Sequence, residues 1–237
     1  MQKETDIQAV IEKAILFLHI KPKENDGQLG KFFIKHPILE TSMTILPSTN
    51  KMFDIFNEPE TYSKWVKETA EFFRKQKSVF GLTAHIRKSY RLAFFKYINE
   101  YLSEQDFAEL LKIVWIQTEF NSDTTNVSQK EMVNWFRTAN KKYLMDDKER
   151  NRLSSLPNGV SVCRGVRSAD YKYGMSWTLN YNKAKWFAER FDAKTPIIYK
   201  TIIQKEDILA YINERNEQEV ILDPDVLKRY EIEEVEE

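Results

Sequence analysis

The chain has 237 residues, of which 42% are hydrophobic and 30% are charged, with 36 basic and 36 acidic side chains. This composition excludes a chain that is disordered throughout, and its length supports one large core or two small ones without disulfide staples. The single cysteine, Cys163, excludes an internal disulfide framework, and no apolar run approaches the ~18 residues that span a bilayer. The start also lacks the pattern of a secretory signal, so we expect a cytoplasmic protein with no membrane span.

The first part of the chain carries helical periodicity. Apolar residues recur at spacings of three and four between residues 5 and 19, which predicts an amphipathic helix. Four prolines then break residues 21–60 into short elements and loops. Ser103 is a predicted helix cap, and residues 1–125 are predicted to form a helical region. Further helices are predicted at 60–77, 82–102 and 104–117.

Residues 126–237 are predicted to form an α+β region. Ser128 and Glu131 have the spacing of a capping box at the start of a helix, and Asp146 begins a shorter helix. After Gly159 the apolar period changes to two, which is typical of strands. The predicted strands are 160–166, 195–203, 219–222 and 230–237, and the predicted helices among them are 182–191 and 206–212.

Charge is unevenly distributed along the chain. Residues 64–100 hold nine basic and three acidic side chains, whereas residues 206–237 hold three basic and twelve acidic ones. A basic segment can bind nucleic acid or another acidic partner, but two solvated faces of opposite sign give the same counts. Both interpretations are open from the sequence.

The second half also holds three short motifs in a fixed order. The first motif ends a predicted strand, the second directly precedes a predicted helix, and the third opens an apolar strand. Ionised carboxylates are costly to bury without partners, so two of them on one face of a strand indicate either a wet face or a function. When the two carboxylates are considered without the other motifs, a charged strand edge that resists aggregation explains them equally well. The motif residues are Arg164 and Gly165, then Ser176, Trp177 and Thr178, then Glu217 and Glu219.

In this order and on these elements, the motifs resemble those of the ADP-ribosyltransferase superfamily, in its Arg, Ser and Glu-x-Glu class, which includes mono-ADP-ribosylating bacterial toxins. The resemblance covers residues 145–225 and departs from the usual pattern at Trp177, where a small hydroxyl residue is expected. It implies an α+β fold in which a helical N-terminal region precedes a mixed β-sandwich core. It also implies an enzyme that cleaves NAD, as a substrate, and transfers ADP-ribose to a macromolecule. No metal is implied, and Cys163 and the histidines lack metal-ligand spacing.

The first two motifs would bind NAD. Arg164 supplies a planar cationic fork for the pyrophosphate, and Gly165 would let the nicotinamide approach the main chain. The resemblance implies that Ser176 holds the catalytic glutamate by a hydrogen bond and that Thr178 fixes the following helix, although a simple helix cap is an equal alternative for Thr178.

Aromatic residues in and after the second motif offer flat surfaces on which a nicotinamide ring would stack. Aromatic residues at helical spacing usually belong to the core, so Trp186 and Phe187 are predicted to serve mainly in packing. The four candidates are Trp177, Tyr181, Trp186 and Phe187.

The two glutamates are predicted to have different roles. Breaking the bond between nicotinamide and ribose develops positive charge on the sugar, as in glycoside hydrolysis, and Glu219 would stabilise that charge. Glu217 would face the acceptor and align it or take its proton. In the predicted loop before them, Tyr211 and Arg215 would contact the acceptor, or they are simply an exposed aromatic residue and a surface charge.

The acceptor and the biological context are less constrained. A glutamate at the first position of Glu-x-Glu resembles members that modify arginine, whereas the basic, aromatic segment 78–97, with Arg87, Lys88 and Arg91, favours RNA or DNA. By analogy, the chain is predicted to act as the toxin of a toxin–antitoxin or phage-defence system, with an antitoxin as its protein partner. The alternatives are an NAD glycohydrolase and a non-catalytic binding module on the same fold.

Overall fold

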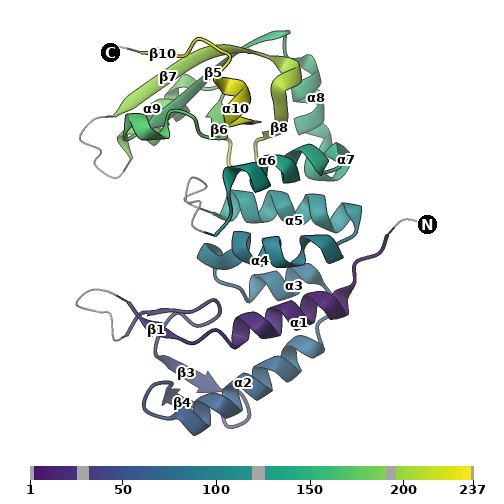
Figure 1. Cartoon of the computed structure of the whole chain (residues 1–237), viewed down its shortest axis with the longest axis vertical. Coiled ribbons are helices and arrows are strands. Elements are labelled where there is room, and N and C mark those ends of the chain that lie inside the picture. Colours follow the sequence, from purple (N-terminus) through teal and green to yellow (C-terminus); the bar gives the residue numbers. More distant parts are fainter. Residues whose placement is uncertain (1–2, 26–31, 119–125, 191–195, 236–237) are drawn as a thin grey trace. The chain divides into compact units, whose positions relative to one another are not determined.

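The computed structural model describes residues 3–25, 32–118, 126–190 and 196–235 of the chain. The chain forms two compact units, Met1–Glu119 and Phe120–Glu237, and each contains helices and strands (Figure 1). The prediction of a protein that mixes helix and sheet is therefore confirmed. Within the described ranges, no helix combines the length and the apolar character that crossing a bilayer requires.

Unit 1 is built mainly from helices whose apolar stripes pack together. The first helix starts at Asp6, whose side chain accepts a hydrogen bond from the main chain of Ala9. Ser103 caps the last helix, as predicted, by accepting a hydrogen bond from the main chain of Asp106. The helices are α1 (Ile7–Leu18), α2 (Pro59–Arg74), α3 (Val79–Ala84), α4 (Arg91–Ile98) and α5 (Glu104–Gln117), with 3-10 turns at Lys88–Tyr90 and Asn99–Tyr101.

Unit 1 also contains two short antiparallel hairpins, so the region predicted as helical at 1–125 also holds strands. They lie in the proline-rich segment, where prolines and polar residues favour turns over helix. Asn50 has a φ of 55° in the turn of the second hairpin, a conformation that asparagine tolerates well. The hairpins pair β1 (Lys23–Glu24) with β2 (Ile34–Lys35), and β3 (Met43–Leu46) with β4 (Lys51–Asp54).

The helix predicted at 82–102 is interrupted at Arg87. The backbone of Arg87 is extended, with φ −60° and ψ 143°, and its main-chain N–H donates to the carbonyl of Pro37. The side chain of Arg87 also donates to main-chain carbonyls of the segment that contains β2. A tertiary contact between distant segments therefore overrides the local helical pattern at this position.

The first helices of unit 2 begin with the predicted caps. Ser128 and Glu131 exchange both hydrogen bonds of a capping box at the start of α6 (Gln129–Thr138). Asp146 and Glu149 do the same at the start of α8 (Asp147–Ser155). Each box satisfies two main-chain N–H groups that a helix leaves without partners. The short helix α7 (Lys141–Leu144) lies between them in sequence.

The strands of unit 2 form one six-stranded sheet in the order β10-β7-β5-β6-β9-β8. Every pairing in the described part of this sheet is antiparallel, in place of the mixed arrangement predicted. A single residue pair, Cys163 and Thr178, joins β5 to β6. The strands are β5 (Gly159–Val166), β6 (Ser176–Thr178), β7 (Ile197–Gln204), β8 (Ile208–Ile212), β9 (Glu219–Leu222) and β10 (Glu233–Glu234).

Two predicted elements of unit 2 differ from the structure. Residues 206–212, predicted as a helix, form a 3-10 turn at Lys205–Asp207 followed by β8, which pairs with β9. The strand predicted at 230–237 is confined to β10, and residues 236–237 lie outside the described ranges. The remaining helices are α9 (Tyr181–Glu189) and α10 (Pro224–Leu227), with a 3-10 turn at Ala169–Tyr171.

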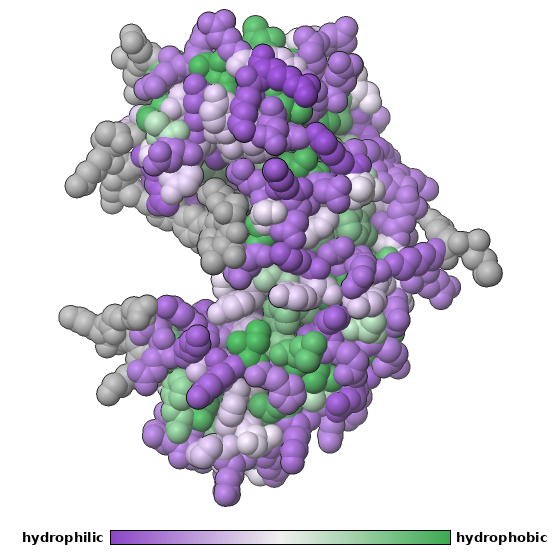
Figure 2. All heavy atoms as spheres, viewed as in Figure 1, coloured by the Kyte–Doolittle hydropathy of each residue, from purple (hydrophilic) through white to green (hydrophobic). Residues whose placement is uncertain are grey.

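The core of unit 2 is formed largely by its strands. Every residue of β9 is buried, and β7 alternates buried and solvent-facing positions along most of its length. Hydrophilic residues cover most of the face drawn in Figure 2, with hydrophobic residues in patches among them. A strand that is buried throughout makes Glu219, at the start of β9, an unusual residue for its position.

Candidate active site

Arg164 is held on β5 by main-chain acceptors. Its Nε donates to the carbonyl of Tyr171 at 2.9 Å, and Nη1 donates to the carbonyl of Ser176. Nη2 makes no hydrogen bond with a described residue and packs over Gly174, where a Cβ would lie 2.1 Å from it. The side chain is thus fixed in place while part of its donor fork is left for a ligand.

The charge of Arg164 interacts with Glu219, the catalytic candidate on β9. Burial lowers the pKa of the Arg164 guanidinium to about 10, and the charge of Glu219 acts in the opposite direction and raises it. Glu219 itself is 6% exposed. The first and third motifs of the sequence therefore interact through their charges, between a buried Glu219 and a partly buried Arg164.

Gly165 has a packing role on the other side of β5. A Cβ at this position would lie 1.7 Å from the carbonyl oxygen of Ala184 on α9, so any side chain would collide with the helix backbone. Side chains alternate along a strand, so this contact lies on the face opposite to Arg164. The approach of nicotinamide to the Gly165 main chain stays a prediction, whereas close packing of helix on strand is sufficient reason for a glycine here.

The second motif places Thr178 at the level of the catalytic candidate. In the pairing of β6 with β9, Thr178 lies opposite Glu219 and Ser176 lies opposite Ile221. Directly paired residues of antiparallel strands share a face, so the Thr178 and Glu219 side chains emerge together. The predicted hydrogen bond from the Ser176 hydroxyl to Glu219 does not occur between the described residues. Ser176 instead supplies its main-chain carbonyl to Arg164.

The hydroxyl of Thr178 connects the third motif to α9. It donates to the main-chain carbonyl of Glu217 at 2.6 Å and accepts from the main-chain N–H of Asn180 at 3.0 Å. Asn180 is the N-cap of α9, and its side chain accepts from the main chain of Asn182 at 2.9 Å. One buried hydroxyl therefore positions both the start of α9 and the chain at Glu217.

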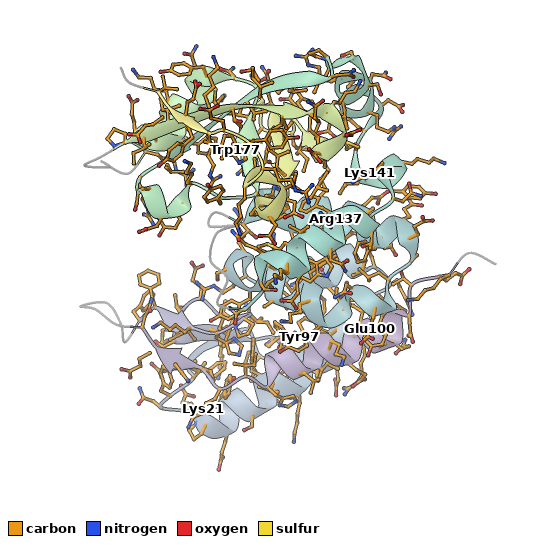
Figure 3. The ribbon with its side chains drawn as sticks, turned by 45° about the horizontal axis from the view of Figure 1, so that its top comes forward. Lys21, Tyr97, Glu100, Arg137, Lys141 and Trp177 are labelled. Carbon is orange, nitrogen blue, oxygen red and sulfur yellow. The ribbon has the colours of Figure 1, made fainter. Side chains whose placement is uncertain are left out.

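Trp177 does not offer a stacking surface, which corrects its predicted role in NAD binding. It is 1% exposed, and its indole N–H donates to the carbonyl of Gly174 at 2.9 Å. Figure 3 shows it in the interior of unit 2. The packing role predicted for Trp186 is also wrong, because that side chain is 53% exposed on α9. Strand alternation turns Trp177 inward, and the outer face of α9 carries Trp186.

The two glutamates do not lie on a common strand face. β9 begins at Glu219, so Glu217 belongs to the loop of residues 213–218 that connects β8 to β9. Asn216 and Gln218 have φ values of 54° and 48°, in the left-handed region that non-glycine residues rarely adopt. The left-handed turn at Gln218 breaks the period-two relationship between its neighbours. Such strained positions cluster at functional sites.

The strained loop is anchored at several points by hydrogen bonds. Asn213 Oδ1 accepts from the main chain of Gln218 at 2.9 Å, and Asn213 N–H donates to Glu149 Oε1 at 2.8 Å. Arg215 Nε lies 3.3 Å from Glu217 Oε1, in an ion pair whose side chains are 50% and 17% exposed. The loop thus presents Glu217 near the surface while Glu219 stays buried.

Tyr211 lies on β8 and is not part of the predicted acceptor loop. It pairs with Val220 and is 4% exposed, and burial raises the pKa of its phenol, an effect that Arg152 opposes. A buried ring cannot contact a macromolecular acceptor, so this predicted role is wrong. Arg215, half exposed and paired with Glu217, is the remaining acceptor-loop candidate.

Glu149 and Asn213 support the site and were not among the residues chosen from the sequence. The pattern Asp146 to Glu149 has the spacing of a capping box, which identifies the contact of the Glu149 carboxylate with Asp146. Its contact with Asn213 joins segments far apart in sequence, and local spacing carries no signal for it. Glu149 is 3% exposed, so its contacts are made inside unit 2.

In the part of the chain that the structure describes, no group of three or more His, Cys, Asp or Glu side chains is placed to hold a metal ion. Comparisons of the chain with protein-family models, with curated proteins and with solved structures found no match.

Proposed function

We propose that this protein is an NAD-dependent mono-ADP-ribosyltransferase of the toxin-like class, which cleaves the nicotinamide–ribose bond and transfers ADP-ribose to a macromolecular acceptor. The observation that carries the proposal is the charge interaction between Glu219, buried at the start of β9, and the Arg164 guanidinium on β5. Buried charges are costly, so their convergence from distant segments favours a functional site over a structural accident.

The chemistry of Arg164 fits one end of the substrate. Its Nη2 has no hydrogen bond to a described residue, and the other nitrogens fix the plane of the guanidinium. A planar cation held in this way binds a pyrophosphate by paired hydrogen bonds. Its role is to hold NAD while the glycosidic bond breaks.

Glu219 would stabilise the reacting sugar. The bond between ribose C1′ and the nicotinamide nitrogen breaks, nicotinamide leaves as a neutral molecule with the electron pair, and positive charge develops on the ribose. A carboxylate that is already in place and shielded from water stabilises such charge effectively, because it needs no reorganisation.

Glu217 would complete the transfer. The acceptor nucleophile bonds to C1′ and loses a proton, and Glu217, on the loop near the surface, takes that proton. Arg215 holds its carboxylate at 3.3 Å, and the Thr178 hydroxyl holds its main chain. A protein arginine and a nucleic acid are both suitable acceptors. By analogy with toxins of this class, we include an antitoxin as a neutralising partner.

The experiment follows both halves of NAD. The full chain and its Glu219→Gln and Glu217→Gln variants are incubated with a cell lysate and NAD that carries one label on the adenylate and another on nicotinamide. We expect wild type to release nicotinamide and label a macromolecule, Glu219→Gln to do neither, and Glu217→Gln to retain more release than transfer. Release of nicotinamide without any labelled macromolecule identifies an NAD glycohydrolase. If wild type releases no nicotinamide, both enzymatic hypotheses are rejected and a non-catalytic binding module is favoured.

A further inference from the structure

The basic segment 78–97, the surface predicted to bind nucleic acid, uses its arginines internally. Arg87 Nη1 donates to the carbonyls of Ile34 at 2.9 Å and Leu39 at 3.2 Å. Arg91 Nε donates to the carbonyl of Ile86 at 2.8 Å. The rings of Phe94 and Phe95 in the same segment are completely buried. These groups hold unit 1 together and do not form a platform for bases.

The outer face of α9 combines an exposed tryptophan with basic side chains. Its inner face carries Ala184 and Ala188, which are fully buried against Cys163 and Ile198. Its outer face carries Trp186, which is 53% exposed, whereas Tyr181, 39% exposed, is the first residue of the helix and lies beside the inner face. A flat aromatic ring that is exposed to this extent offers a surface on which a base can stack.

A cation lies beside the exposed tryptophan. The Arg190 guanidinium lies 5.5 Å from the ring centroids of both Trp186 and Phe187, and these two rings lie edge to face with centroids 5.0 Å apart. Lys183 and Lys185 stand on the same helix, and the single acid of α9, Glu189, lies 3.7 Å from Lys185. The helix therefore combines flat rings with a net positive charge.

The N-terminal end of this surface lies at the candidate active site. The Thr178 hydroxyl binds both the N-cap of α9 and the carbonyl of Glu217. A helix rises about 1.5 Å per residue, so Trp186 lies roughly 7.5 Å along the axis from Tyr181, the first residue of α9. A nucleotide strand that follows α9 would thus reach Glu217 within a few nucleotides.

We propose that the outer face of α9, with Trp186, Lys183 and Arg190, binds single-stranded nucleic acid. We further propose that this nucleic acid is the acceptor of the ADP-ribosyltransferase reaction, and this second part rests on the proposed function. Bases stack on exposed aromatic rings without regard to sequence, and lysine and arginine neutralise the phosphates beside them. A protein acceptor that presents an arginine would instead meet a surface of its own charge.

Binding is tested without NAD, on the full chain, by the fluorescence anisotropy of labelled single-stranded RNA and DNA of mixed sequence over a salt series. We expect Trp186→Ala to weaken binding about tenfold, the loss of one stacked base, and Trp186→Phe to weaken it less. Arg190→Gln is expected to reduce the slope of log affinity against log salt by about one. Thermal melts of each variant verify that it is folded.

Tyr173→Ala is the matched control. Tyr173 is 40% exposed with the Lys172 ammonium 5.7 Å from its ring centroid, and the same ammonium lies 5.1 Å from the ring of Tyr199. Tyr199 points away from α9, because its neighbour Ile198 packs against that helix. We expect Tyr173→Ala to bind as wild type does. Absence of wild-type binding at low salt, or equal losses in Trp186→Ala and Tyr173→Ala, overturns the proposed surface.

The acceptor part is tested by transfer of labelled ADP-ribose to the same RNA and DNA. We expect labelled oligonucleotide with wild type and much less with Trp186→Ala, while both release nicotinamide. Label on protein alone overturns the acceptor assignment but leaves the transferase proposal standing. If wild type releases no nicotinamide, the transferase proposal is rejected, and the acceptor role with it. The binding data still decide whether α9 binds nucleic acid.

Discussion

Thr178 Oγ1 donates a 2.6 Å hydrogen bond to the main-chain carbonyl of Glu217, across a gap of 39 positions in the sequence. The same oxygen accepts the main-chain N–H of Asn180, which caps α9. We infer that this hydroxyl fixes the position of Glu217, the residue proposed to face the acceptor, relative to α9, the helix proposed to bind the nucleic acid.

We predict that Thr178→Val, which keeps the shape and removes the hydroxyl, reduces transfer to the acceptor more than it reduces nicotinamide release. It leaves a part-buried carbonyl and an N–H unpaired, which costs about 1 to 2 kcal/mol of unfolding free energy. The measurements are urea unfolding and the ratio of the two reaction rates. Thr178→Ser restores the hydroxyl and should recover the ratio, and equal losses of both rates in Thr178→Val would contradict the positioning role.

Gly165 should not tolerate a side chain. The Cβ of Gly165→Ala would lie 1.7 Å from the Ala184 carbonyl oxygen, so α9 and β5 must move apart at a cost of about 3 kcal/mol. The control is Gly159→Ala on the same strand, whose Cβ would meet Ile202 Cγ2 at an ordinary 3.4 Å. Urea unfolding measures both, and a Gly165→Ala protein as stable as Gly159→Ala would show that the helix does not pack as described.

Unit 1 should lose stability at acid pH because of His36. This residue is fully buried, and its Nδ1 accepts from the main chain of Ile38 at 3.1 Å and of Leu39 at 2.9 Å. Burial lowers its pKa from 6.5 to about 4, against the raising effect of the Leu18 and Ile20 carbonyls. The unfolded chain binds the proton first, so stability is full above pH 6.5 and falls as the pH drops toward 4, by about 3 kcal/mol in all.

The test compares urea unfolding of wild type and His36→Asn across this range of pH. Asparagine keeps an acceptor for the two main-chain N–H groups and cannot titrate there. We expect a smaller loss of stability between pH 6.5 and 4 in the variant. The same slope in both proteins would show that other groups cause the acid sensitivity.

Arg87 and its neighbour Lys88 should behave differently, although both belong to the same basic segment. Arg87→Ala removes hydrogen bonds to several main-chain carbonyls and should cost about 2 to 3 kcal/mol of unfolding free energy. Lys88 is exposed, so Lys88→Ala should change stability by less than about 0.5 kcal/mol. Neither is expected to change nucleic-acid binding by the folded protein. A large loss of nucleic-acid binding in Lys88→Ala would show that the basic segment of unit 1 binds the nucleic acid.

Local patterns predicted the elements that depend on local physics. Capping boxes and periodic apolar residues located α6, α8 and α1, and the β-branched runs located β5 and β7. The apolar spacing of residues 206–212 fits either a helix or a strand, and only the pairing of this segment with β9 makes it a strand. The secondary structure of this segment therefore depends on a pairing with a distant strand, which the neighbouring residues in the sequence do not reveal.

The roles of the motif residues stay predictions. Motif order in the sequence points to Arg164 and Glu219, and the charge of Glu219 acts on Arg164. The exposure of the tryptophans could not be inferred, because Trp177 faces inward only through the alternation of β6 and Trp186 faces outward only through the packing of α9 on β5. The left-handed backbone at Gln218 has no marker in the sequence, since glycine or asparagine usually occupies such a position.

The most direct test of the proposed enzyme is the rate of nicotinamide release from NAD by the purified chain, measured for wild type, Glu219→Gln and Glu189→Gln. Glu189 is an exposed glutamate on α9, and its variant controls for the loss of a surface charge. We predict release by wild type and Glu189→Gln at similar rates, and a loss of at least about a hundredfold in Glu219→Gln, which removes a preorganised charge. Equal rates in wild type and Glu219→Gln, or no release by wild type, would contradict the account.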